Sequence, residues 1–335
     1  MTMTMPGGEP NRRSGSGATA VKARHAKKEE MSLFRRVFLP VLLILVGLSV
    51  MLYPVVATQW NNHVQRQIAD RYDESMREQQ ENDPEALIRA VEEAREYNAA
   101  NKGGPILDPW LARVSKDNEA YQEYLDHLKG ASAMSQVTIP SIDSKLPVYH
   151  GTDEETLQKG LGHLFGSALP VGGEGNHTVI TGHTGLTNAT LWDNLIDVKE
   201  GDAIYVSTFG EKMKYEVYDI DVVLPEETDS LGDQEGRDLL TLITCTPYGI
   251  NTHRLLVHAE RVPMDEEDLQ ALEDASGFKM QWWMWLVVAA AALVLLLLIW
   301  WIRRQAKKNK SEEDAAEAND EAAEAEAGAE IDEEN

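Results

Sequence analysis

Two long apolar segments interrupt an otherwise polar chain of 335 residues. Residues 37–57 and 282–302 contain no charged side chain, and each is long enough to cross about 30 Å of hydrocarbon as a helix. Tryptophans stand at both ends of the second segment, which is typical of a span whose ends lie in the two interfaces of a membrane. The pattern predicts two transmembrane helices.

Basic residues flank both segments on the side away from the middle of the chain. Arg35 and Arg36 precede the first segment, and Arg303 and Arg304 follow the second. By the positive-inside rule, both termini are predicted to be cytoplasmic, with the stretch between the spans outside the cell membrane. A signal-peptidase site near Ala57 is the alternative for the first span; the length of its apolar run favours an uncleaved anchor.

The terminal segments have unusual compositions. Residues 1–36 are rich in Gly, Ser, Arg and Lys, and residues 303–335 are basic and then rich in Ala, Glu and Asp. Both are expected to be disordered in the cytoplasm, because they offer little apolar surface to bury. A specific cytoplasmic partner for the acidic tail is the alternative.

Residues 58–136 are polar with scattered apolar positions, and they predict one or two helices that lead from the membrane to a globular domain. Asp83 and Pro84 mark a helix start, since aspartate caps free backbone N–H groups and proline suits the first turn. The Lys-Gly-Gly-Pro run beginning at Lys102 ends the pattern in a loop. Residues 264–281 are expected to be a linker to the second span.

Residues 137–263 have the texture of a mainly β domain. Short apolar runs alternate with Gly, Pro and Asp, and their spacing favours a closed or nearly closed antiparallel barrel over alternating β-α-β units. Short helices are expected at 157–161 and 191–196. The β-like runs are 137–139, 147–149, 178–181, 203–206, 214–223, 239–244 and 254–258.

The net charge of −25 falls mostly on the stretch between the spans. An acidic surface of this kind repels phosphate backbones and anionic head groups, which argues against nucleic acid as a partner. Membrane lipid is the expected partner of the two spans.

Cys245 is the single cysteine of the chain. It cannot form a disulfide within its own chain, and structural zinc sites usually need more than one thiolate. A domain outside the membrane lies in an oxidising compartment, where an unpaired thiol is a liability unless it has a chemical role. Cys245 is therefore a candidate nucleophile, and an inert buried thiol is the alternative.

Two other residues stand at the ends of β-like runs. His183 lies in a Gly-His-Thr-Gly turn, and Arg254 opens a later run. An imidazole can move protons between a thiol and a leaving amine, while a guanidinium favours the thiolate and can stabilise a negative carbonyl oxygen. Together with Cys245 they predict thiol-based acyl transfer. The other histidines considered are expected to be structural or on the surface: His150, His163, His177, His253 and His258.

These motifs and their neighbours resemble the active-site motifs of sortases, which are membrane-anchored cysteine transpeptidases of Gram-positive bacteria. The resemblance covers roughly residues 137–262, in the family's order and spacing. It is carried by Gly162-His163-Leu164-Phe165-Gly166-Ser167, Leu169-Pro170-Val171-Gly172-Gly173, Thr181-Gly182-His183, Leu242-Ile243-Thr244-Cys245 and Thr246-Pro247-Tyr248-Gly249-Ile250-Asn251-Thr252-His253-Arg254.

The resemblance implies an eight-stranded sortase β-barrel and an acyl-transfer mechanism. Cys245 would attack the Thr–Gly bond of a sorting signal similar to Leu-Pro-x-Thr-Gly, and an amine would resolve the thioacyl enzyme. His183 would be the general acid and base, and Arg254 would stabilise the oxyanion or position the substrate. No cofactor and no metal is implied. A calcium site in the acidic stretch 219–229 is the alternative to a solvated face, but no oxygen-rich loop of EF-hand type is present.

Asp108-Pro109-Trp110 resembles the lid motif of class C sortases, which polymerise pilins. In that class the acidic residue pairs with the active-site arginine and the aromatic ring covers the cysteine. Carried over, Asp108 would meet Arg254 and Trp110 would cap Cys245. The second span is also typical of class C. The resolving nucleophile would then be a lysine amine of a second pilin subunit.

Two other functions stay open from the sequence. A sortase that attaches surface proteins to a peptidoglycan precursor would use the same chemistry with a different acceptor amine. A non-catalytic surface or signalling protein with a sortase-like barrel is the second alternative, and the presence of Cys245, His183 and Arg254 together argues against it.

Overall fold

The structure is a computed structural model that describes residues 16–102, 108–109, 117–274 and 280–333. The chain forms two compact units: residues 54–281 make one, and residues 1–53 with residues 282–335 make the other. The first unit holds the candidate site, and the second holds most of the predicted span 37–57 and all of the predicted span 282–302.

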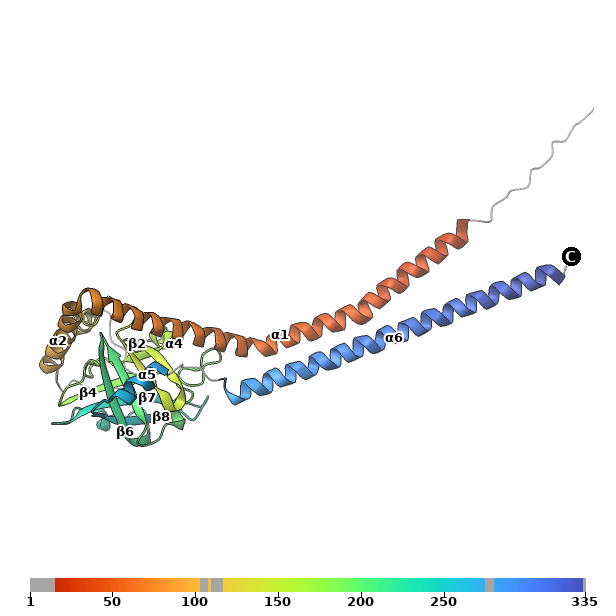
Figure 1. The fold of residues 1–335 in the computed structure, drawn as a ribbon. Helices are drawn as coiled ribbons and strands as arrows, with labels where there is room; N and C mark the ends of the chain where they lie inside the picture. The colour runs from red at the N-terminus through yellow and green to blue at the C-terminus, as the bar shows by residue number, and fades with distance from the viewer. Residues whose placement is uncertain (1–15, 103–107, 110–116, 275–279, 334–335) are drawn as a thin grey trace, which may run out of the picture. The chain divides into compact units, whose positions relative to one another are not determined.

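The strands of the first unit are β1 (Ser135–Ile139), β2 (Ser144–His150), β3 (Leu161–His163), β4 (Asn176–Thr181), β5 (Ala203–Thr208), β6 (Glu211–Val223), β7 (Asp238–Thr246) and β8 (His253–Val262). They close into a barrel in the order β1-β2-β3-β4-β7-β8-β6-β5 (Figure 1). The predicted closed eight-stranded barrel is confirmed. Purely antiparallel pairing is wrong, because β2–β3 and β4–β7 are parallel. A parallel pair requires a crossover connection, which residues 151–160 supply between β2 and β3.

β7 shows how the barrel is packed. Residues 239–246 are all buried, although side chains on a strand point alternately to opposite faces. Leu240 and Leu242 lie in the main core, whereas Ile243 belongs to a smaller apolar cluster on the other face. Because both faces are covered, the strand is a nearly continuous apolar run. Cys245 lies on the Ile243 face, at the end of this rigid strand.

The helices among the described residues are α1 (Ser16–Asn82), α2 (Pro84–Ala100), α3 (Glu119–Asp126), α4 (Glu154–Lys159), α5 (Glu266–Asp274) and α6 (Trp282–Glu333). Short 3₁₀ turns occur at Pro140–Ile142, Leu195–Asp197 and Asp229–Leu231. The predicted helix start at Asp83 is confirmed: its side chain accepts a hydrogen bond from the backbone N–H of Ala86 at 3.1 Å, and Pro84 is the first residue of α2.

The described helices extend beyond the two apolar segments. α1 begins at Ser16, and α6 continues to Glu333. Ala, Glu, Lys and Arg are strong helix formers, and the apolar spans provide helices that these residues only have to extend. The expected linker 264–281 contains α5, and the short helix expected at 157–161 lies at Glu154–Lys159.

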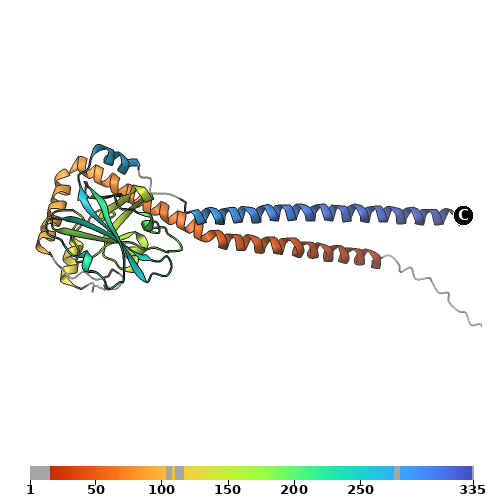
Figure 2. The same cartoon turned by 90° about the horizontal axis from the view of Figure 1, so that it is seen from below.

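The C-terminal half of α1 packs along the outside of the barrel (Figure 2). The buried hydroxyl of Tyr72 accepts a hydrogen bond from the backbone N–H of Phe209 at 2.8 Å, at the tip of the β5–β6 hairpin. Phe209 and Gly210 have φ values of +46° and +86°, the two-residue turn that suits the twist of a hairpin. This contact fixes α1 against the strands.

Among the described residues, two helical segments are long and apolar enough to cross a membrane. They are found within Val37–Asn82 and Trp282–Asn319, with mean hydropathy values of 2.5 and 2.7. Both coincide with the segments predicted from the apolar pattern, which is consistent with a membrane-anchored protein.

Candidate active site

Cys245 and Arg254 face each other across two neighbouring strands. They are register partners in the antiparallel β7–β8 pair, which places their side chains on one face of the sheet with Cβ atoms about 5 Å apart. Cys245 is 8% exposed and Arg254 is 7% exposed. The barrel therefore brings together two residues that the sequence placed at the ends of separate strands.

His183 comes to the same end of the barrel because β4 runs parallel to β7. The backbone N–H of Gly182 donates to the carbonyl of Ile243 at 3.1 Å, so the chain leaves β4 beside the end of β7. The hydroxyl of Thr244 donates to the carbonyl of Gly182 at 2.7 Å. Thr244 was left out of the site predicted from sequence, yet it ties the strand of the thiol to the turn of the imidazole.

Gly182 is required by close packing on this turn. A Cβ at this position would lie 2.6 Å from Cδ2 of Leu161 and 2.9 Å from Cε3 of Trp192, closer than real contacts allow. The backbone N–H of Trp192 also donates to the carbonyl of His183 at 3.1 Å. The glycine thus lets the His183 turn sit directly on the fully buried indole of Trp192.

Asp193 holds the residues that follow His183. Its Oδ1 accepts hydrogen bonds from the hydroxyl of Thr184 at 3.1 Å and from the backbone N–H of Gly185 at 2.8 Å. Burial raises the pKa of Asp193 to about 6, and the two hydrogen bonds oppose that rise. Sequence reasoning did not include Asp193; a capping carboxylate near a Gly-turn is the signal that was available.

Arg254 is bound at two points by Asp108. Its Nε lies 2.6 Å from Oδ2 of Asp108, and its Nη2 lies 3.2 Å from Oδ1. Nη1 donates to the backbone carbonyls of Asn251 and His253 at 3.4 and 3.3 Å. The side chains of the pair are 9% and 2% exposed, so a charged pair lies buried beside the thiol.

Burial and this pair act on the thiol together. Burial has the largest effect and raises the pKa of Cys245, the charge of Arg254 opposes that rise, and the carboxylate of Asp108 adds to it. Asp108 thus offsets part of the help that Arg254 gives to the thiolate.

Two of the three residues of the predicted lid are described. Asp108 bonds Arg254, and the carbonyl of Pro109 accepts a hydrogen bond from the hydroxyl of Thr152 at 3.0 Å. Trp110, predicted to cap Cys245, lies outside the described residues.

Glu154 is a second carboxylate that the sequence did not point to. Its Oε2 lies 3.4 Å from Nε2 of His183, and its side chain is 66% exposed. Glu154 is the first residue of α4, whose start is capped by Asp153 through a 2.9 Å hydrogen bond from the backbone N–H of Thr156. The capped helix end holds the carboxylate next to the imidazole.

Three other histidines are buried in hydrogen-bonded positions. His163 donates from Nε2 to the carbonyl of Ala168 at 2.8 Å, and burial lowers its pKa to about 4. His177 and His258 share the hydroxyl of Thr241 at 2.7 and 2.8 Å. In the described part of the chain, no group of three or more His, Cys, Asp or Glu side chains is placed to hold a metal.

Comparison with known proteins gives a family match and several similar structures. The sortase domain family matches residues 137–262. Sortase C-1 from Actinomyces oris is 56% identical with a TM-score of 0.51, over 53% of this chain and 99% of that chain. Sortase A from Corynebacterium diphtheriae is 50% identical with a TM-score of 0.55, over 62% and 98%; a lid mutant of it is 51% identical with a TM-score of 0.52, over 56% and 99%.

Sortase C from Streptococcus pneumoniae, whose substrates are pilins, is 39% identical with a TM-score of 0.54, over 59% of this chain and 97% of that chain. Curated relatives are covered less completely: the chain spans about half the length of sortase A from Streptococcus agalactiae, which is 31% identical over 127 residues. Nearly the whole of the three solved sortases from Actinomyces oris, Corynebacterium diphtheriae and Streptococcus pneumoniae is nevertheless matched, at 39% identity or more. The chain therefore belongs to the sortase family of cysteine transpeptidases.

Proposed function

We propose that the protein is a pilin-polymerising sortase that is held at rest by a carboxylate on its active-site arginine. The observation that carries the proposal is the buried two-point pair between Arg254 and Asp108 beside Cys245. A buried charge needs a partner, and this partner occupies a cation that thiol chemistry requires. The similarity to a sortase with pilin substrates and to a sortase with a lid supports the same assignment.

Cys245 is the nucleophile of the proposed reaction. Its Sγ attacks the threonine carbonyl carbon of a Leu-Pro-x-Thr-Gly-like signal, the thiol proton passes to His183, and Arg254 donates to the oxygen that becomes negative. The C–N bond then breaks as His183 returns the proton to the leaving glycine amine. The acyl group remains on Sγ as a thioester.

A lysine amine of a second pilin subunit resolves this thioester. The amine attacks the acyl carbon and gives a proton to His183, and the C–S bond breaks as that proton returns to the sulfur of Cys245. The product is an isopeptide bond between two subunits, and the enzyme regains its thiol.

Glu154 is proposed to orient the imidazole. Its carboxylate, 3.4 Å from Nε2 of His183, favours a proton on that nitrogen. Nδ1 then carries the lone pair that can accept the thiol proton. This role is positional, because Glu154 acts through the histidine.

Arg254 cannot bind Asp108 and an oxyanion with the same donors. Asp108 must therefore withdraw before the reaction, and its withdrawal also lowers the pKa of Cys245 by removing a negative charge. Trp110 is proposed to leave the thiol in the same movement. The lid segment is thus a latch that the substrate has to open.

The proposed setting is the outer face of a cell membrane. The spans at 37–57 and 282–302 would anchor the chain, the barrel at 137–263 would lie outside, and both termini would be cytoplasmic. The length and hydropathy of the two helices and the arginines beside them support this topology.

The test uses the full chain in nanodiscs, a pilin subunit with its sorting signal, and a second pilin that offers the acceptor lysine. We expect an isopeptide-linked product by mass spectrometry, lost in Cys245→Ala and lost when the acceptor lysine becomes arginine. A product in Cys245→Ala would overturn the catalytic role. Transfer to a peptidoglycan-precursor amine but not to pilin would assign wall anchoring instead, and an unreactive thiol would favour a non-catalytic protein.

A further inference from the structure

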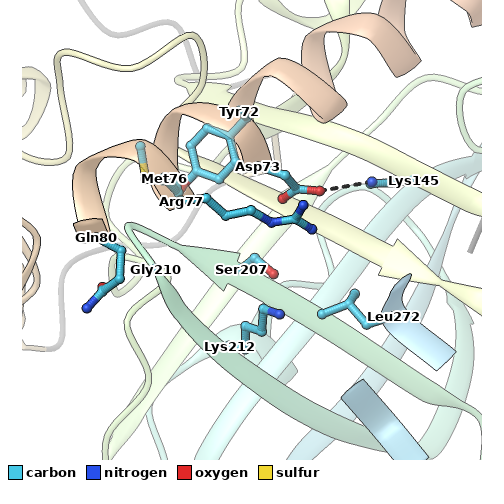
Figure 3. A pocket seen from close by; sticks show the side chains of 10 residues that line it. All are labelled: Tyr72, Asp73, Met76, Arg77, Gln80, Lys145, Ser207, Gly210, Lys212 and Leu272. Atoms are coloured by element: carbon cyan, nitrogen blue, oxygen red, sulfur yellow. Dashed lines mark ion pairs between the residues drawn. The ribbon is translucent and has the colours of Figure 1, made fainter. Parts of the chain in front are cut away.

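A cavity of about 630 Å³ lies on the barrel wall formed by β2, β5 and β6 (Figure 3). The thiol site, by contrast, stands on β4, β7 and β8. Tyr72 and Met76 of α1 make one apolar side of the cavity, and Leu272 of α5 makes another. A volume of several hundred cubic ångströms is typical of sites for small organic ligands.

The walls of this cavity are fixed by buried hydrogen bonds. Tyr72 is bonded to the tip of the β5–β6 hairpin, as described above. α5 is held by Asp268, whose Oδ1 accepts from the hydroxyl of Tyr205 and from Nζ of Lys214, both at 2.7 Å. Because both helices are tied to the strands between them, the cavity is preformed and needs no closure to exist.

The charged residues that line the cavity are Asp73, Arg77, Lys145 and Lys212, so cations outnumber carboxylates three to one. Lys145 is paired: its Nζ lies 2.9 Å from Asp73 and 3.1 Å from Asp70, and its side chain is 12% exposed. Three cations and two carboxylates therefore leave a net charge of +1 around the cavity.

Arg77 and Lys212 enter the cavity from different elements. Arg77 reaches in from α1 and Lys212 from β6, and the side chain of Ser207 on β5 lies between them in the view of Figure 3. Within the part of the chain that the structure describes, neither cation has an ion-pair or hydrogen-bond partner. Two open cations in one hollow stand out on a domain whose other charges are mostly acidic.

We propose that this cavity binds a small soluble phosphate monoester. A guanidinium fork, an ammonium and a hydroxyl offer donors from three directions, which suits the three terminal oxygens of a phosphate. A monoester carries a charge between −1 and −2 at neutral pH, so the net positive charge of the cavity attracts it and Arg77 and Lys212 can each donate to it. The organic part of the ligand lies against Tyr72, Met76 and Leu272.

The test is a calorimetric titration of the full chain in a nonionic detergent, at constant ionic strength and in a phosphate-free buffer. The probes are inorganic phosphate, glycerol 3-phosphate and malonate. We expect saturable binding of both phosphates at one site, with glycerol 3-phosphate tighter because its carbon chain meets the apolar side. Arg77→Gln and Lys212→Gln should each weaken binding about tenfold or more, the usual loss for a hydrogen bond to a charged group.

Lys199→Gln is the matched control, because Lys199 is exposed and does not line the cavity, and its substitution changes the net charge by the same amount. The dissociation constant of this variant for glycerol 3-phosphate should equal that of the unaltered chain. Equal weakening by Lys199→Gln would reduce the effect to general charge and overturn the site. Absence of saturable binding would overturn it too, and malonate binding as tightly as glycerol 3-phosphate would overturn the phosphate assignment.

Discussion

The cations of the thiol site and of the cavity on the β2–β5–β6 wall differ in burial and in pairing. Arg254 is buried beside Cys245 and forms an ion pair with the carboxylate of Asp108. Arg77 and Lys212 are exposed residues at an open hollow, where the neighbouring carboxylates bond Lys145 instead.

The difference follows from desolvation. A buried guanidinium without a partner costs several kcal/mol, so it must be paired whenever substrate is absent. A cation in contact with water has no such cost and can remain unpaired until a ligand binds. A site with a buried cation therefore needs a partner that can be displaced. A site with exposed cations needs only a cavity of the right shape.

Removal of the buried cation is expected to have the largest effect. Arg254→Ala leaves the carboxylate of Asp108 buried without its partner and should lower the free energy of unfolding by about 3–5 kcal/mol. It should also slow transpeptidation about 100- to 1,000-fold, because a donor to the oxyanion is lost. Denaturant unfolding in detergent and the pilin assay measure the two effects.

Arg237→Ala is the control for that loss. Arg237 makes an equally short 2.6 Å pair with Glu260, but the two side chains are 32% and 41% exposed. Its removal should change the free energy of unfolding by no more than about 1 kcal/mol. Equal destabilisation by the two substitutions would contradict the distinction between buried and exposed cations.

The pH dependence of stability tests the role of Asp193, which lies beside the His183 turn. Its folded pKa of about 6 lies above the ordinary value, so its ionisation costs stability as pH rises from about 4 to 6. Asp193→Asn keeps an Oδ1 acceptor for Thr184 and Gly185 and removes the charge. The variant should be more stable than the original by about 3 kcal/mol at pH 8 and equal to it at about pH 3.5, in thermal unfolding.

A stability difference that does not depend on pH would contradict this account of Asp193. Asp193→Ala, which removes the acceptor as well, should slow transpeptidation at every pH. Activity unchanged in Asp193→Ala would show that the His183 turn does not depend on this side chain.

Asp108→Asn removes the negative charge that is paired with Arg254. Loss of the negative charge leaves Arg254 to favour the thiolate, so the pKa of Cys245 should fall. At neutral pH the rate of iodoacetamide alkylation should rise about tenfold, which corresponds to one pKa unit. Asp219→Asn, an exposed carboxylate on β6, is the matched control and should leave the rate unchanged.

Tyr72→Phe should have the smallest effect. It removes the acceptor for the Phe209 N–H and should lower the free energy of unfolding by about 1 kcal/mol, the usual value of one hydrogen bond. Transpeptidation should not change, because Tyr72 fixes α1 at the cavity, whereas the position of His183 depends on β4. A large loss of activity in Tyr72→Phe would mean that the two regions are coupled.

Local features of the fold could be predicted from the sequence. The cap at Asp83 and the short β-like runs are determined by neighbouring residues, and the thiol, imidazole and guanidinium carry recognisable chemistry. The parallel β4–β7 pair could not be predicted, because strand register depends on contacts distant in sequence. That pair is what brings His183 to the end of β7.

The supporting residues were missed for the same reason. Thr244, Asp193 and Glu154 are ordinary polar residues until the fold places them beside the His183 turn. The cavity was invisible because its walls come from α1, three strands and α5.

Because the Asp108–Arg254 pair takes the arginine out of use, free enzyme divides between paired and open populations. If closure is worth about 2 kcal/mol, roughly one molecule in thirty is open, and the apparent affinity for a sorting signal falls by that factor. A soluble peptide at low concentration then meets an almost inert enzyme. In the proposed membrane setting, a substrate anchored in the same membrane would be present at an effective concentration in about the millimolar range and would overcome the penalty. The proposed latch would thereby select substrates that are tethered to the membrane.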